Sequence, residues 1–177
     1  MPVTTEVDVR YSDEHASPTS WPETLARLAG AGVSWIVSVR PDGVPHATPM
    51  VPVVDDDRVY FHTGTQEVKY DNISANPHVL VLAGGTEWDR GLDVVFQGLA
   101  VPVQETGDLE RLARAWHRQW DGRWRLEVHD GAVVHPDATG APELVVFEVR
   151  PDRAYAYAKG STFSHTRHRF DTEEGDR

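Results

Sequence analysis

A series of short segments rich in β-branched and aromatic residues, separated by turn residues, most strongly constrains the fold of this chain. The segment 34–39 reads SWIVSV, and the RPDG turn at 40–43 sends the chain back as a second strand, which predicts a β-hairpin. Similar segments follow at 57–63, 78–84, 92–103 and 143–159. Because short turns favour antiparallel pairing and few helices intervene, we expect a mainly β fold, a closed antiparallel barrel with peripheral helices.

Prolines interrupt the second strand of this hairpin at positions 45, 49 and 52. Proline has no N–H to donate to a neighbouring strand, so the segment is expected to be bulged or to lie at a sheet edge, where a planar ligand could approach its backbone. Gly98 interrupts the long segment 92–103. A glycine within a strand indicates a bulge or a close contact at a barrel corner.

Helical patterns occur in three places along the chain. The run SWPE at 20–23 has the residues of a capping box, with leucines at helical spacing after it. Residues 65–77 predict a second helix that ends at Asn76 and Pro77. Apolar residues recur every three or four positions in 106–122, which predicts an amphipathic helix packed on the barrel.

Chain length and composition suit one folded domain. A chain of 177 residues with 40% hydrophobic content can bury a single core, which we place at residues 19–170. Residues 1–18 are polar and are expected to form a loose arm, and residues 171–177 form a charged tail. No stretch approaches the roughly 18 apolar residues of a membrane helix, and the start lacks a signal-peptide pattern. We therefore expect a cytoplasmic protein without membrane contacts.

Several classes of function are disfavoured by composition. The chain has no cysteine, which excludes disulfides, zinc-thiolate sites and thiol nucleophiles, so redox chemistry would need a bound cofactor. A net charge of -11 opposes binding to nucleic acids. The nine histidines are scattered, with only His165 and His168 close together, so no metal site is predicted. Neither a dinucleotide-binding glycine motif nor a P-loop is present.

The order of these segments resembles a known family. The strings WIVSVRPDG, PHATPMVPV, VYFHTGTQEVKYDNISANPHVLV and LDVVFQGLAV, followed by FSHTRHRF, are similar to the actinobacterial branch of the pyridoxamine 5'-phosphate oxidase superfamily. The resemblance covers about residues 21–170 and implies a split β-barrel of the FMN-binding type. Such proteins bind FMN, or the deazaflavin coenzyme of actinobacteria, at a homodimer interface. The resemblance therefore implies a cofactor-dependent oxidoreductase that acts on a small-molecule substrate.

The resemblance also implies a set of cofactor-binding residues. Lys69 would supply a charge-assisted hydrogen bond to the cofactor phosphate, of roughly 1.5 to 3 kcal/mol, and nearby threonine hydroxyls and helix amides would add to it. The family usually has a basic residue after this lysine, whereas here Tyr70 follows, so an arginine from elsewhere remains an alternative. The full set is His46, Thr48, Pro49, Met50, Val51, Thr63, Thr65, Lys69, Asn72, Gln97, Gly98, Arg167 and Arg169.

Different parts of the cofactor correspond to different segments of this set. In the family, the strand at 46–51 lies along the flavin ring, where backbone amides of Met50 or Val51 could bond its polar edge. Gln97 and Gly98 match the strand beside the ribityl or phosphate portion, because an amide can bond hydroxyls and a glycine permits close approach.

The C-terminal segment FSHTRHRF matches a family segment that tends to read FSQTRWRF. Arg167 and Arg169 alternate along an expected strand, so both lie on one face and could meet an anion. Together with Lys159 they are candidates for a groove that holds the acidic tail of a deazaflavin. Histidines replace the usual glutamine at 165 and the usual aromatic residue at 168, which puts ring stacking at 168 in question.

The leading functional hypothesis is hydride or electron transfer between the cofactor ring and a small substrate, with positioning and electrostatics as the protein's part. No side-chain acid or base is predicted. A non-catalytic protein that stores, carries or senses a flavin remains an alternative, as does a structural homodimer with a decayed pocket. The tryptophans Trp88, Trp116, Trp120 and Trp124 are expected in the core or in dimer contacts.

Overall fold

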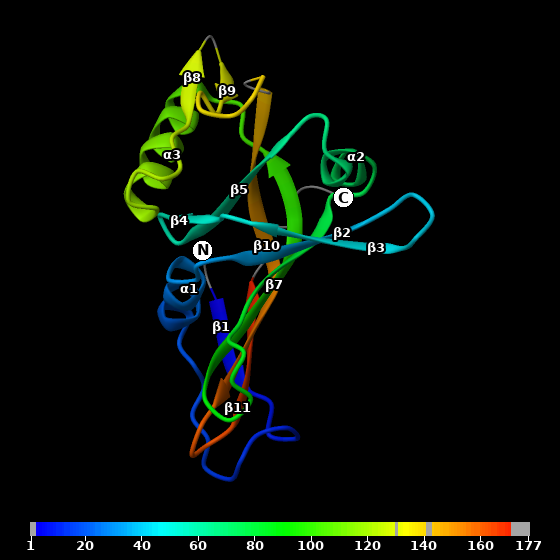
Figure 1. Cartoon of the computed structure of the whole chain (residues 1–177). Helices are drawn as coiled ribbons and strands as arrows, with labels where there is room; N and C mark the ends of the chain where they lie inside the picture. Colours follow the sequence, from blue (N-terminus) through cyan, green and yellow to red (C-terminus); the bar gives the residue numbers. More distant parts are fainter. Residues whose placement is uncertain (1–2, 130, 141–142, 171–177) are drawn as a thin grey trace.

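The computed structural model describes residues 3–129, 131–140 and 143–170 and contains one antiparallel sheet and three helices within them (Figure 1). The strands are β1 (Val3–Val7), β2 (Ser34–Val39), β3 (Pro45–Met50), β4 (Val53–Asp55), β5 (Arg58–Gly64), β6 (His78–Ala83), β7 (Gly91–Pro102), β8 (Glu127–His129), β9 (Ala132–Val134), β10 (Glu143–Lys159) and β11 (Ser164–Phe170). The helices are α1 (Trp21–Ala29), α2 (Val68–Ala75) and α3 (Thr106–Gln119).

The strands follow the order β1-β11-β10-β7-β6-β2-β3, and β5 and β9 also pair with β10. Strand β10 runs the length of the molecule in Figure 1, pairing with β5 in its first half and with β11 in its second. The mainly antiparallel split-barrel fold is thus confirmed, but the expected closure is not: the described sheet is open, with β1 and β3 at its ends. The prolines of β3 explain its place at an edge, because they cannot donate to a further strand.

Two cores form on opposite faces of β5 and β10. Phe61 lies in the larger one with Phe96 and the apolar face of α1. Tyr60, the preceding residue, points to the other side and packs with Trp116 of α3. This separation follows from the alternation of side chains along a strand. Trp116 and Trp120 are buried as expected.

Helix α1 begins as the sequence predicts. The hydroxyl oxygen of Ser20 accepts a hydrogen bond from the Glu23 amide at 3.4 Å, and the Glu23 carboxylate accepts one from the Ser20 amide at 2.9 Å. This capping box satisfies amides that the first turn leaves without partners. The helix then buries Leu25 and Leu28 against the sheet.

Gly98 marks the close contact expected from its position in β7. It lies opposite Pro151 of β10, where the pairing register shifts before Arg153. A Cβ atom added to Gly98 would lie 2.1 Å from the backbone oxygen of Arg150. The close neighbour is therefore the bulged strand β10.

Two further features differ from the sequence-based expectations. The loose arm predicted for residues 1–18 is wrong for residues 3–7, since β1 pairs with β11 along its whole length. This strand was not predicted because its residues are mixed in polarity and mostly half-buried, and because its partner lies at the far end of the sequence. The short hairpin β8–β9 was also not predicted. Trp88 is 78% exposed and lies outside the core, so of the two positions expected for it only a dimer contact remains. No helix in the described ranges has both the length and the apolar character needed to cross a bilayer.

Candidate functional site

Donor groups converge on one carboxylate between the end of β5 and the start of α2. The Glu67 carboxylate accepts a hydrogen bond from the Gly64 amide at 2.8 Å and forms an ion pair with the Lys69 ammonium. Thr63 lies next to Gly64 and is 1% exposed, and Lys69 is 7% exposed. We refer to Thr63, Gly64 and Lys69 as the anion cradle, which the Glu67 carboxylate occupies in this structure.

The anion cradle favours a negative charge. Partial burial alone would raise the pKa of Glu67, but hydrogen bonds from Lys69 and from the Gly64 amide outweigh it, so this pKa lies below its ordinary value. The same kinds of donor, a buried ammonium and a backbone amide, bind phosphate groups in proteins, and here the amide belongs to Gly64 at the end of β5. The sequence predicted Thr63 and Lys69 as ligands of a cofactor phosphate. It gave no sign that Glu67, two positions before Lys69, would occupy the cradle.

Asn72 connects α2 to the β2–β3 hairpin. Its side chain is 2% exposed, and its Nδ2 donates to the Ser38 hydroxyl at 3.0 Å and lies 3.4 Å from Nδ1 of His46. Asn72 and His46 are thus brought together on the inner face of the hairpin, one turn of helix from Lys69. Ser38 belongs to this cluster and was not foreseen, because nothing in the sequence of β2 distinguishes it.

Thr48 carries a buried hydroxyl without a partner. Its Oγ1 makes no hydrogen bond to any described residue. Thr48 lies between His46 and Met50 on the same face of β3, while Pro49 faces outward and is exposed. A buried polar atom without a partner costs free energy, so this hydroxyl suits a hydrogen bond to a bound molecule. Val51 follows the strand, and its carbonyl accepts from the Trp116 indole at 2.8 Å.

The remaining predicted residues lie farther along the sheet. Thr65 donates its amide to the Glu143 carbonyl at 3.3 Å and so joins the cradle loop to β10. Gln97 donates to Asp152 at 3.3 Å and lies opposite Arg153, which in turn lies opposite Arg169 of β11. Arg153 was not predicted, because only the pairing of β7 with β10 places it beside Gln97.

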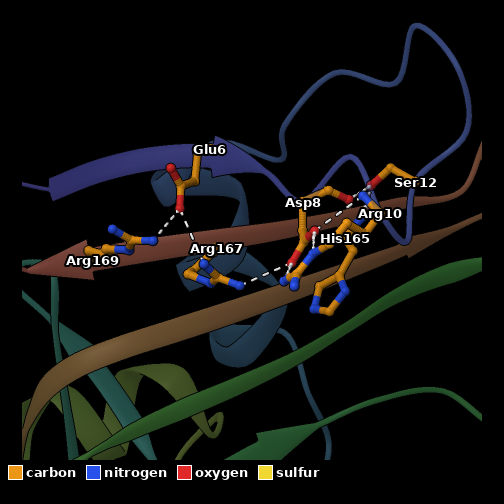
Figure 2. Close-up of polar contacts among 7 residues, drawn as sticks. All are labelled: Glu6, Asp8, Arg10, Ser12, His165, Arg167 and Arg169. Atoms are coloured by element: carbon orange, nitrogen blue, oxygen red, sulfur yellow. Dashed lines mark hydrogen bonds and ion pairs between the residues drawn. The ribbon is translucent and has the colours of Figure 1, made fainter.

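The terminal arginines already face an anion from this chain. Figure 2 shows the Glu6 carboxylate between Arg167, at 3.4 Å, and Arg169, at 2.8 Å. Arg167 also pairs with Asp8 at 3.0 Å. The guanidinium of Arg10, 2.6 Å from Asp8, holds the pKa of that carboxyl well below its usual range. The expectation that both arginines share one face is confirmed.

Arg167 of β11 and Lys69 of α2 lie near opposite ends of β10. Leu144 at the start of β10 pairs with Gly64 of the anion cradle, whereas Tyr155 near its end pairs with Arg167. The structure thus brings His46, Thr48, Thr63, Lys69 and Asn72 to one region and the terminal arginines to another.

His168 is part of the framework of the fold. It is fully buried, with Nε2 2.9 Å from the Thr24 hydroxyl and Nδ1 2.9 Å from the Thr5 hydroxyl. Because the Thr24 hydroxyl donates to the Ser20 carbonyl, its oxygen is free to accept from Nε2–H, and Nδ1 then accepts from Thr5. Burial lowers the pKa of His168 to about 4. The imidazole therefore joins β1 and α1 to β11.

A second buried imidazole lies beneath α3. His62 contacts the rings of Trp116 and Trp124, with centroids 5.2 and 5.5 Å away. Burial, reinforced by His135 and Lys69, lowers the pKa of His62 to about 4. Among the described residues, no cluster of three or more His, Asp and Glu side chains could hold a metal ion.

The comparisons with known proteins agree on the fold. The family model of pyridoxamine 5'-phosphate oxidase matches residues 20–158. A conserved hypothetical protein from Mycobacterium tuberculosis aligns with a TM-score of 0.63 and 21% identity, over 79% of this chain and 85% of its own. A heme binding protein from Mycobacterium smegmatis aligns with a TM-score of 0.61 and 15% identity, over 85% of this chain and 58% of its own.

An F420 reductase aligns with a TM-score of 0.51 and 24% identity, over 73% of this chain and 93% of its own. No curated protein matches the sequence. At these identities the solved structures show a shared fold, and their names assign no ligand to this chain.

Proposed function

The chain belongs to the pyridoxamine 5'-phosphate oxidase family, and we propose that it binds a flavin-type cofactor and uses it as an oxidoreductase on a small organic substrate. The observation that carries this proposal is the anion cradle, where the buried Lys69 ammonium and the Gly64 backbone amide converge on the Glu67 carboxylate. A cofactor phosphate would replace the Glu67 carboxylate there. The ring would follow β3, where the Thr48 hydroxyl has no partner within the described structure.

FMN is the cofactor that these contacts support best, with a deazaflavin coenzyme as the alternative. The basic side chains proposed for a long acidic tail are each paired internally: Lys159 with Asp93 at 2.9 Å, and both terminal arginines with Glu6. A single phosphate needs only the anion cradle. Bound there, the flavin would supply hydride or electron transfer, while residues of β3 and α2 would orient the ring and exclude water from one of its faces.

Titration with FMN and with a deazaflavin, followed by fluorescence, tests this proposal. We expect micromolar or tighter affinity for one of them. If neither binds, the proposed function is wrong. Binding without turnover of any quinone, enone or biliverdin-like acceptor would favour the non-catalytic carrier or sensor.

Removing the cradle ammonium is expected to weaken cofactor binding. Lys69→Ala should lower FMN affinity by about 10- to 100-fold, since a charge-assisted hydrogen bond contributes about 1.5 to 3 kcal/mol. Glu67→Gln should raise FMN affinity, because it removes the carboxylate that competes with the phosphate. Lys159→Ala is the matched control, since this lysine pairs with Asp93 elsewhere. Equal losses in the Lys69 and Lys159 variants would contradict the phosphate assignment.

We also propose that a second copy of the chain packs against an apolar row on the outer face of the sheet. An apolar cross-strand row consists of Trp35, Leu82, Val95 and Tyr155, which lie opposite one another on β2, β6, β7 and β10. Trp35 is 50% exposed, and the other three are half-buried. A continuous apolar row of this kind on the face away from the core is typical of a protein interface.

Placing a charge in this row is expected to separate the copies. Trp35→Asp should shift the molar mass measured by light scattering from that of a dimer to that of a monomer, because an unpaired carboxylate would be buried in the interface. Val44→Asp provides a control of similar exposure, at 49%, in the turn beside the same strand. A monomeric wild-type protein would contradict the homodimer proposal.

A further inference from the structure

A pocket of about 300 Å³ lies at the end of the β10–β11 hairpin, at the opposite end of β10 from the anion cradle. Its lining includes the rings of Tyr11, Tyr157, Phe163 and His165. Tyr157 and His165 lie opposite each other on β10 and β11, with centroids 4.5 Å apart. None of these four residues belongs to the anion cradle or lies on β3 or α2.

The aromatic surface of this pocket is exposed to an unusual degree. Tyr11 is 66% exposed, and its ring centroid lies 5.6 Å from that of His165. Trp88, 78% exposed, stacks on Phe163 with centroids 5.7 Å apart and an interplanar angle of 30°. Large aromatic side chains are normally buried, and a contiguous group left in solvent indicates a binding site. A flat ring entering the pocket would cover several of these faces.

Hydrogen bonds from the N-terminal segment hold the pocket wall in place. The Phe163 amide donates to the Asp13 carboxylate at 2.7 Å, and the Asp13 amide donates to the Phe163 carbonyl at 3.0 Å. The His165 amide donates to the Ser12 hydroxyl at 2.9 Å. The segment that carries Tyr11 is therefore fixed against β11, and the pocket exists before any ligand arrives.

Charges around the pocket are paired within the chain. The Lys159 ammonium lies 2.9 Å from the Asp93 carboxylate and donates to the Glu87 carbonyl at 2.5 Å. The Arg10 guanidinium pairs with Asp8. Burial lowers the pKa of His165, which keeps its imidazole neutral near pH 7. A charged ligand would have to break one of these pairs, whereas a neutral ligand would not.

We propose that this pocket binds a neutral, planar aromatic molecule of one or two fused rings. The ligand should be neutral because the charges around the pocket are already paired, and planar because aromatic rings line the pocket. It should be small because the pocket volume lies at the lower end of the roughly 300–1,000 Å³ of small-molecule sites. The site does not depend on the anion cradle or on a bound flavin.

The test uses 2-methyl-1,4-naphthoquinone as the probe and backbone amide NMR shifts as the measurement on the full chain. Saturable shifts are expected at residues 11–13 and 157–165. Tyr11→Ala and Phe163→Ala should each weaken the probe's affinity about fivefold, the usual scale of one aromatic contact. Val9→Ala, at a side chain 82% exposed, is the control and should bind as wild type.

The outcomes separate this site from the proposed cofactor site. Naphthoquinone-2-sulfonate, which adds a negative charge, should bind more weakly than the neutral probe. Lys69→Ala should leave probe binding unchanged even if it abolishes FMN binding. Shifts confined to β3 and α2, or affinities unaffected by both aromatic substitutions, would overturn the proposal.

Discussion

Replacing Gly98 with alanine is expected to destabilise the folded chain by about 3 kcal/mol, near the upper end of overpacking substitutions. The new Cβ would lie 2.1 Å from the Arg150 carbonyl oxygen and 2.8 Å from Cα of Pro151. Both are backbone atoms of the bulged strand β10, so no side-chain rotation can relieve the contact. Urea unfolding followed by tryptophan fluorescence gives the change in the free energy of unfolding.

Gly107→Ala is the matched control for this substitution. Gly107 lies in α3, and a Cβ added there meets no atom within 4 Å. Because alanine favours a helix over glycine, this variant should be up to about 1 kcal/mol more stable than wild type. If Gly98→Ala kept wild-type stability and lost only cofactor affinity, the glycine would serve ligand approach, as first expected from its place beside Gln97.

Acidification from pH 6.5 to pH 4 is expected to remove a large part of the stability. Burial lowers the pKa of both His62 and His168 from 6.5 to about 4 in the folded chain. Between these values the unfolded chain binds protons that the folded chain does not, so the free energy of unfolding falls as the pH falls. A shift of this size corresponds to up to about 3 kcal/mol for each histidine, fully lost only below pH 4.

Substitution of each histidine should flatten this pH dependence. His62→Phe keeps an aromatic ring between the two tryptophans, and His168→Gln keeps an amide that can reach both threonine hydroxyls. Each should reduce the slope of unfolding free energy against pH between 4 and 6.5. His15→Asn, at a side chain 89% exposed and a positive φ that asparagine tolerates, should leave the slope unchanged. Equal slopes in all three variants would contradict the assignment.

The parts of the fold that depend on local chemistry were predictable from the sequence. The capping box of α1 needs only residues 20–23, and the β2–β3 hairpin needs only the RPDG turn and its flanking strands. The prolines of β3 predicted an edge strand for the same reason, because the missing N–H of a proline removes a hydrogen-bond donor at that residue itself. Gly98 predicted a close contact but could not identify its partner on β10.

Features that depend on distant residues were not predictable. Nothing in residues 1–7 indicates a partner at the other end of the chain, because the strand is short and mixed in polarity. The Glu67 carboxylate within the anion cradle, and the Thr48 hydroxyl without a partner, emerge only once β5, α2 and β3 have their positions. His168 departs from the family pattern because its imidazole bonds two threonines in other elements.

The pairing of β1 with β11 sets the order in which this protein can be completed during synthesis. Thr5 and His168, which bond to each other, are 163 positions apart in the sequence. β1 leaves the ribosome long before β11 and must therefore wait for it, and Asp8 waits with β1 for Arg167. Contacts between such distant positions form slowly and late. The nascent chain therefore exposes β1 without its partner strand until β11 has been synthesised.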